Sequence, residues 1–317
     1  MSRSPDINND NPRGLAARLW VYQKERFPLG QTAVLVGFFT AATLSVSAQL
    51  AGRPLPTIWT FLAVWIGVLV IFFQMRACDE YKDLETDKRY RPERPIPRGL
   101  VTLKTIIVIA IFAGFLAIAA TTAVSTALLL PLALVWFWLF VMTKEFWVPE
   151  WLISKPFLYL VSHMAIMPII DLYISGAEWI EHGQHPPSGL WIFLVLSFLN
   201  GCVLEFGRKI WTPANERDGV ETYSKLLGPV KAVWAWTGFC ALAAVFLIIV
   251  AAKLGAMLWV GIPAILTLLY VLFTAQKFAG NPTDAVQKKI ETLAGLWVVM
   301  CYGLAGFMPL LKGWIAG

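Results

Sequence analysis

The sequence predicts an all-α, polytopic membrane protein with about nine transmembrane helices in a bundle around a central cavity, preceded by an N-terminal interfacial helix. Hydrophobic residues make up 58% of the 317 residues and charged residues only 15%, whereas soluble domains carry roughly 25% charged residues. Apolar runs of about 20 residues, the length that crosses the hydrocarbon layer, recur along the chain. The 15 tryptophans and 19 prolines agree, because Trp gathers at membrane interfaces and bundled spans tolerate Pro.

Residues 1–28 form the first predicted unit, a polar tail and an amphipathic helix on the membrane surface. Residues 1–12 are polar, and the stretch that follows, RGLAARLWVYQKERF, sets Leu, Trp, Tyr and Phe side chains among basic ones. That pattern is typical of a helix lying in the interface. We expect no signal peptide, because the first long apolar run begins near Leu29 and no small-residue cleavage pattern follows it. Residues 29–317 are expected to form a single transmembrane domain.

Nine apolar runs are long enough to span the membrane. They cover approximately residues 29–50, 57–75, 101–120, 123–143, 156–176, 188–210, 230–252, 255–275 and 291–312. If the N-terminus is cytoplasmic, all of the 26 Lys and Arg residues except Arg53, Lys253 and Lys312 fall on the cytoplasmic side. The positive-inside rule therefore predicts a multi-pass protein of the cell membrane with its C-terminus on the opposite side. The net charge of +6 is explained by this topology and by contact with the lipid bilayer, and we expect no nucleic-acid partner.

The four cysteines are widely spaced and form no C-x-x-C pair. They stand at Cys78, Cys202, Cys240 and Cys301. Free cysteines behave as small hydrophobic residues in helix interfaces. We therefore expect reduced thiols packed among helices and no metal or redox centre.

An acidic and then basic stretch, RACDEYKDLETDKRYRPERPIPRG, follows the second span. Asp79, Asp83 and Asp87 recur every four residues, so on one continuous helix they form an acidic stripe, and Glu80 reaches the same turn. Three prolines then break the helix. The basic residues that follow the stripe include Lys88, Arg91, Arg94 and Arg98.

A second polar segment, residues 200–229, follows the sixth span, on the same side of the membrane. Glu205 precedes two basic residues, Arg208 and Lys209, at helical spacing. Glu216 lies close to three helical turns beyond Glu205, although a proline interrupts the intervening segment, and Asp218 follows it.

The aligned carboxylates favour Mg²⁺ over zinc, because Mg²⁺ prefers oxygen ligands. Mg²⁺ binds through one or two carboxylates together with substrate phosphates, and arginine or lysine suits the remaining phosphate oxygens. The two segments therefore predict a diphosphate held by Mg²⁺ between them. For the second segment, a merely solvated loop explains the residues equally well. The candidate metal ligands are Asp79, Glu80, Asp83, Asp87, Glu205, Glu216 and Asp218.

From Asp79 onward, DEYKDLETDKRYRPERPIPRGL resembles the first aspartate-rich motif of the UbiA superfamily of intramembrane prenyltransferases. That motif reads N-D-x-x-D-x-x-x-D, followed by a basic stretch and R-P-[IL]-P-x-G. Asp83 and Asp87 match it, whereas Asp79 and Glu80 stand where the family has Asn and Asp. In the second segment, GVET and a later glycine match the family's ending, but the upstream carboxylates depart from its repeated aspartates.

The resemblance implies a prenyltransferase-like domain over residues 29–317. It implies Mg²⁺-dependent transfer of a prenyl group from a prenyl diphosphate to a lipophilic or aromatic acceptor. Mg²⁺ and basic groups would neutralise the leaving diphosphate, and aromatic faces would stabilise the allylic cation. Lys144 and Lys155 resemble the basic residue that the family uses on the diphosphate. The candidate diphosphate ligands are then Lys88, Arg91, Arg94, Arg98, Lys144, Lys155, Arg208 and Lys209.

The residue that takes the acceptor proton is left open among Tyr81, Tyr159 and His163. A hydrogen-bonded histidine between helices explains His163 at least as well. Two alternative functions also stay open. One is a related enzyme that cyclises the prenyl diphosphate without an acceptor, and the other is a cation-coupled transporter. Transporters place their polar sites near the bilayer midplane, whereas these carboxylates cluster at the ends of two spans, which argues against transport.

Overall fold

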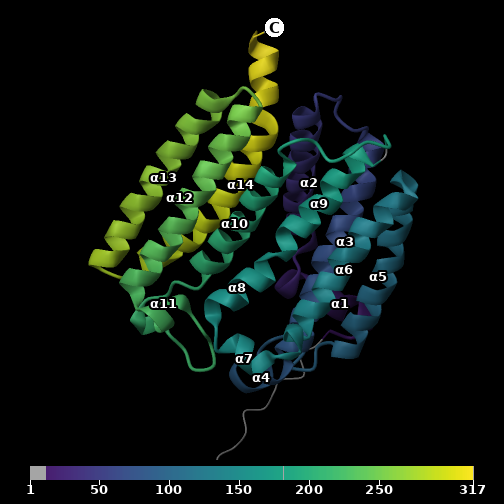
Figure 1. The fold of residues 1–317 in the computed structure, drawn as a ribbon. Coiled ribbons are helices and arrows are strands. Elements are labelled where there is room, and N and C mark those ends of the chain that lie inside the picture. The colour runs from purple at the N-terminus through teal and green to yellow at the C-terminus, as the bar shows by residue number, and fades with distance from the viewer. Residues whose placement is uncertain (1–11, 181, 317) are drawn as a thin grey trace, which may run out of the picture.

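The computed structural model describes residues 12–180 and 182–316, and within them every regular element is a helix (Figure 1). Nine segments of this part of the chain are long and apolar enough to cross a membrane, as predicted. They are α2 (Leu29–Ala51), α3 (Ile58–Lys82), α5 (Leu103–Val124), η1 with α6 (Thr126–Leu128 and Leu129–Thr143), α8 with α9 (Pro156–Met164 and Ile166–Trp179), α10 (Leu190–Arg208), α12 (Pro229–Lys253), α13 (Met257–Gly280) and α14 (Asp284–Ala316).

Several helices differ from the predicted spans at their ends. α3 continues to Lys82 and α14 begins at Asp284, several residues beyond the apolar runs. Hydropathy marks where a helix crosses the hydrocarbon layer, and polar turns extend it beyond that layer. The fifth span divides into α8 and α9 next to Ala165. Pro168 explains the break, because proline lacks the N–H and clashes with the carbonyl four residues earlier.

Short helices gather at the end of the bundle that lies opposite the C-terminus, where α4, α7 and α11 are visible in Figure 1. Besides α1 (Leu15–Arg26), these elements are α4 (Leu84–Tyr90), η2 (Glu145–Trp147), α7 (Pro149–Ile153), η3 (Pro213–Asn215) and α11 (Tyr223–Leu227). Tyr22 of α1 is buried against Ala77 and Leu100, while Trp20 on the same helix is 61% exposed. α1 is thus an amphipathic helix docked on the ends of α3 and α5.

The bundle has two large hydrophobic cores. One centres on Trp236 and Trp297 and packs α10, α12, α13 and α14 together, and the other packs α2, α3, α6 and α9. Buried polar bonds join the two halves, because Asp171 on α9 accepts hydrogen bonds from Thr43 of α2 (2.7 Å) and Tyr302 of α14 (2.5 Å). The four cysteines are free thiols, three of them buried.

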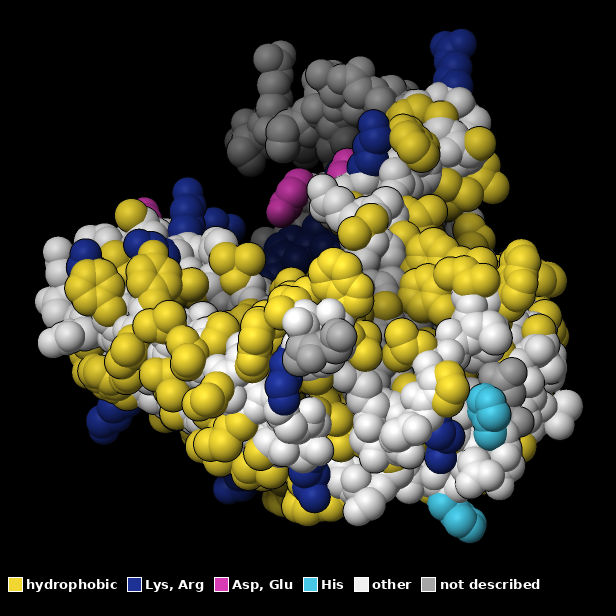
Figure 2. All heavy atoms as spheres, turned by 90° about the horizontal axis from the view of Figure 1, so that it is seen from above, with side chains coloured by type: hydrophobic (Ala, Val, Ile, Leu, Met, Phe, Trp, Pro, Cys, Tyr) yellow, Lys and Arg dark blue, Asp and Glu magenta, His cyan; other side chains and the backbone are white. Residues whose placement is uncertain are grey.

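The outer surface is largely apolar. Seen from the end that carries the C-terminus, it shows broad hydrophobic areas with scattered Lys and Arg side chains (Figure 2). Phe112 on α5 and Leu258 on α13 are 68% and 72% exposed. Lipid contact accounts for such exposure, because a soluble monomer rarely exposes contiguous apolar surface of this extent. The chain is a multi-pass membrane protein.

Candidate active site

The first acidic segment lies where α3 ends. Asp79 is half-exposed, and its Oδ2 lies 3.5 Å from a guanidinium nitrogen of Arg76. Asp83 is exposed and ends α3, with its backbone N–H donating to the carbonyl of Asp79 (2.9 Å). One helical turn separates Asp79 from Asp83, so the two carboxylates share one side of the helix end. The structure therefore places two accessible oxygen donors together at the end of the span.

Asp87 does not continue this stripe. The helix ends at Asp83, and Asp87 lies on the separate helix α4 with its side chain 2% exposed. Arg94 and Arg91 approach its two carboxylate oxygens at 2.6 and 3.3 Å. The expectation of one continuous acidic helix is therefore wrong. A buried carboxylate needs compensating charge, and in this structure Asp87 obtains it from the basic loop.

Glu80 also turns away from the pair formed by Asp79 and Asp83. Its side chain is 2% exposed, and its Oε1 lies 2.6 Å from Nε of Arg26 on α1. The bond spans 54 positions of the sequence. Glu80 and Arg26 thus anchor the N-terminal helix to the end of α3. A role of Glu80 as a metal ligand stays a prediction, and it would require this pair to open.

The remaining basic residues of the first loop are engaged as well. Lys88 pairs with Glu85 on the solvent side (2.7 Å). Arg98 donates to both carboxylate oxygens of Glu25 on α1 at 2.8 Å and to the backbone carbonyl of Glu93. The hydrogen bond from Arg98 holds the pKa of Glu25 below its usual value. The loop is thereby fixed between α1 and α4.

Lys82, which was not among the sequence-predicted site residues, forms the most connected polar group of the site. Its Nζ lies 2.9 Å from Oη of Tyr159, 3.2 Å from Nε2 of His163 and 3.2 Å from Oε1 of Glu145. The side chain is 13% exposed. In the sequence, only its position directly before Asp83 links Lys82 to the site. Its partners lie 63 to 81 residues later, and no local pattern points to them.

Tyr159 and His163, two of the three predicted proton acceptors, come together on α8. Their rings stack with centroids 3.9 Å apart. Nδ1 of His163 lies 2.9 Å from the backbone carbonyl of Tyr159 and therefore donates to it, which leaves Nε2 to accept from Lys82. Tyr81 lies apart from this pair, with its hydroxyl 3.3 Å from Nζ of Lys144. Lys155 is exposed at the start of α8.

The second polar segment divides into a basic helix end and a folded loop. At the end of α10, Glu205 pairs with both Arg208 and Lys209, the latter at 3.0 Å. In the loop, both carboxylate oxygens of Glu216 accept from the hydroxyl of Thr222 (2.6 and 2.8 Å), and Ser224 donates as well (2.8 Å). Asp218 is exposed on the same loop.

The two polar segments lie against each other. Gly219 has a left-handed φ of +73°, and a Cβ at this position would lie 2.4 Å from the ring of Tyr90 on α4. The charge of Arg208 acts on Asp79, and the charges of Glu205 and Lys209 act on His163. The ends of α3, α8 and α10 thus surround one polar region. Among the described residues, however, no three His, Cys, Asp or Glu side chains group closely enough to bind a metal by themselves.

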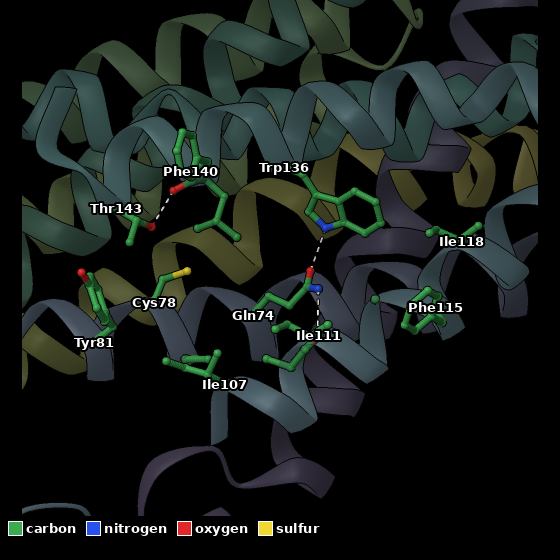
Figure 3. Close-up of a pocket in the computed structure, with 14 residues that line it drawn as sticks. Gln74, Cys78, Tyr81, Ile107, Ile111, Phe115, Ile118, Trp136, Phe140 and Thr143 are labelled. Carbon is green, nitrogen blue, oxygen red and sulfur yellow. Dashed lines mark hydrogen bonds between the residues drawn. The ribbon is translucent and has the colours of Figure 1, made fainter. Parts of the chain in front are cut away.

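An apolar groove begins beside this region, between α3, α5 and α6 (Figure 3). Its volume is about 550 Å³. Tyr81, Cys78 and Thr143 line one end, and Phe115 and Ile118 line the other. Its main polar groups are mutually satisfied, because Trp136 donates to the Gln74 side chain (2.8 Å), which donates in turn to the carbonyl of Ala110 (3.1 Å).

The sequence matches the model of the UbiA prenyltransferase family over residues 32–299. The chain belongs to this family. A comparison with curated proteins gives no match.

Solved structures of UbiA homologues share this fold at low sequence identity. A structure of digeranylgeranylglyceryl phosphate synthase has a TM-score of 0.63 at 14% identity, covering 91% of this chain and 98% of that one. A UbiA homologue from Aeropyrum pernix K1 has a TM-score of 0.62 at 16% identity, with 83% and 96% covered. A homologue from Archaeoglobus fulgidus, bound to DMAPP and Mg²⁺, has a TM-score of 0.55 at 10% identity, with 90% and 99% covered.

Proposed function

We propose that this UbiA-family protein transfers a prenyl group from a prenyl diphosphate to a lipophilic or aromatic acceptor inside the membrane, in a Mg²⁺-dependent reaction. The observation that carries the proposal is the accessible pair Asp79 and Asp83 at the end of a span, with Arg208 of α10 near enough for its charge to act on Asp79. The Archaeoglobus fulgidus homologue bound to DMAPP or GPP with Mg²⁺ supports the same substrate class.

The donor set suits Mg²⁺. Asp79 and Asp83 offer two carboxylates at adjacent turns, and Mg²⁺ is commonly held by one or two carboxylates, with substrate phosphate and water completing its shell. Because substrate phosphate and water complete the shell, Mg²⁺ does not need three protein ligands, and the described residues contain no such group of three. When bound, Mg²⁺ supplies Lewis-acid stabilisation of the departing diphosphate.

Basic side chains bind the phosphate oxygens that Asp79 and Asp83 cannot approach. Arg208 and Lys209 outnumber their partner Glu205, so the end of α10 carries net positive charge. Lys144 and Lys155 are exposed at the start and end of the segment between α6 and α8 and can contribute from that side. Charge-assisted bonds of this kind are roughly twice as strong as neutral ones.

Of the three predicted proton acceptors, Tyr159 is the best placed. Its hydroxyl accepts from Lys82 (2.9 Å) and lies 3.4 Å from a carboxylate oxygen of Glu145, to which it can pass a proton. Both ring nitrogens of His163 are already engaged. His163 therefore orients Tyr159 through the stacked rings. Tyr159 passes its own proton to Glu145 and takes the proton of the acceptor.

The apolar groove accommodates the prenyl chain. It begins beside Cys78, the neighbour of Asp79, and runs between α3, α5 and α6. Ligand pockets for molecules of this size measure about 300–1,000 Å³, and the groove lies in that range at about 550 Å³. A dry, apolar environment also protects an allylic cation from water. The N-terminus and the active-site loops face the cytoplasm, in agreement with the distribution of Lys and Arg.

Product analysis tests this proposal. Purified protein in lipid vesicles is incubated with labelled prenyl diphosphates of several lengths, a membrane lipid extract as acceptor, and Mg²⁺ or EDTA. A prenylated lipid that requires Mg²⁺ supports transfer. A cyclised hydrocarbon formed without the extract would indicate cyclisation instead, and unchanged substrate under every condition would contradict both enzymatic functions.

A further inference from the structure

The proposed diphosphate site has two unlike halves. At the end of α3, Asp79 has a long ion pair with Arg76 (3.5 Å), and Asp83 makes no ion pair within residues 12–180 and 182–316. This half contains carboxylates whose charge is incompletely compensated, which is the condition that attracts a cation.

The half formed by α10 has the opposite character. Glu205 is enclosed by Arg208 and Lys209, which stand three and four residues later on or directly after the same helix, so their pairing follows from helical geometry. Glu216 uses both carboxylate oxygens to hold Thr222 and Ser224. Neither glutamate offers a free carboxylate, although both were predicted as metal ligands.

Lys82 adds a further positive charge beside this half. Tyr159, His163 and Glu145 fix its ammonium group from three sides, and it is 13% exposed. The charges of Lys82 and Lys209 both act on His163. These three partners use all three N–H donors of the ammonium group, so a phosphate oxygen that binds Lys82 takes the place of Glu145.

We propose that this site holds the diphosphate with one Mg²⁺, at Asp79 and Asp83, and that Lys82, Arg208 and Lys209, rather than a second Mg²⁺ at the predicted ligands Glu205 and Glu216, bind the remaining phosphate oxygens. The inference rests on the proposed function. A second divalent cation beside Arg208 and Lys209 would be repelled by them at short range. The same groups attract phosphate oxygens, through charge-assisted hydrogen bonds that suit the guanidinium fork of Arg208.

Counting ions tests the inference without measuring turnover. Full-length protein in detergent is dialysed to equilibrium against radiolabelled Mn²⁺ and radiolabelled inorganic diphosphate, and the excess of each label on the protein side is measured. We expect one Mn²⁺ for each bound diphosphate, and loss of that ion in Asp83→Asn. Two ions for each bound diphosphate would overturn the inference.

Lysine variants test the role of the protein cations. Lys82→Met and Lys209→Met should each raise the Kd for diphosphate at saturating Mn²⁺ about tenfold or more, with the ion ratio unchanged, because each removes a charge-assisted contact. Lys82→Arg retains the charge and should recover part of the affinity. Lys104→Met, at an exposed lysine on α5, is the matched control and should change nothing.

Each outcome separates this inference from the proposed function. If Lys82→Met and Lys209→Met leave the diphosphate Kd unchanged, Lys82 only holds Tyr159 and His163 in place and the inference is wrong, while the enzymatic function stands. If Lys82→Met does not fold, Lys209→Met, which changes a side chain that is 34% exposed, carries the test. Wild-type protein that binds no diphosphate at any Mn²⁺ concentration would overturn the proposed function and this inference with it.

Discussion

The ion pair between Arg26 and Glu80 gives a sharp test of how α1 is attached. Glu80 is 2% exposed and its partner Arg26 is 13% exposed, so Arg26→Met leaves a buried carboxylate without its cation. Removing one partner of a buried ion pair costs about 3–5 kcal/mol. Water that reaches the remaining exposed edge of the pair reduces this penalty, and we expect about 3 kcal/mol. Glu80→Gln keeps the volume and a hydrogen-bond acceptor and should cost about 1 kcal/mol.

A double-mutant cycle measures the coupling directly. Unfolding of the wild type, both single variants and the double variant is followed by tryptophan fluorescence during titration with denaturing detergent. The double variant should be more stable than the sum of the single effects implies, with a coupling energy of about 1–2 kcal/mol. Lys24→Met, at an exposed position of the same helix, serves as the control. Additive effects would refute the pairing, and loss of diphosphate release in Glu80→Gln would indicate that Glu80 is a metal ligand after all.

Three further variants probe the surroundings of the site. Gly219→Ala should destabilise the protein by more than about 1 kcal/mol, because φ is +73° and its Cβ would meet the Tyr90 ring at 2.4 Å; a variant with wild-type thermal stability would contradict the packing of the two segments. Glu25, whose pKa Arg98 lowers, contributes its stabilisation above the ordinary glutamate pKa of about 4.3 and loses it as the pH falls through the lowered value. Arg98→Gln should remove this acid-dependent step, worth under about 1 kcal/mol, from the stability measured between about pH 6 and pH 3, and an unchanged profile would count against the pair. Ile111→Trp fills the groove from its exposed side and should raise KM for long prenyl donors more than for short ones. Equal effects on long and short donors would argue against a prenyl chain in the groove.

The helical architecture follows from the sequence because its causes are local. An apolar run of about 20 residues has few stable alternatives to a membrane-spanning helix. The fit is poorer at Pro168, where one predicted span divides into α8 and α9. Hydropathy does not register the missing N–H that causes this break.

The site shows which features residue spacing alone can predict. Four-residue spacing brings Asp79 and Asp83 to one side of the helix end, as expected, but it also assigns Asp87 to the same acidic stripe. The outcome for Asp87 depends on the arginines of the following loop, and the outcome for Glu80 depends on Arg26, 54 positions earlier. Periodicity defines the face of a helix on which a carboxylate lies. It does not define which distant cation will neutralise that carboxylate.

The central claim is that Asp79 and Asp83 bind the metal ion on which loss of diphosphate depends. The most direct measurement is the rate of diphosphate release from geranyl diphosphate by purified wild-type protein and Asp83→Asn, each with Mg²⁺ and with EDTA. Glu85→Gln is the matched control, because that carboxylate lies two residues away and is 81% exposed. We predict release that requires Mg²⁺, a loss of more than about 100-fold in Asp83→Asn, and wild-type release in Glu85→Gln. Wild-type rates in Asp83→Asn would contradict the account.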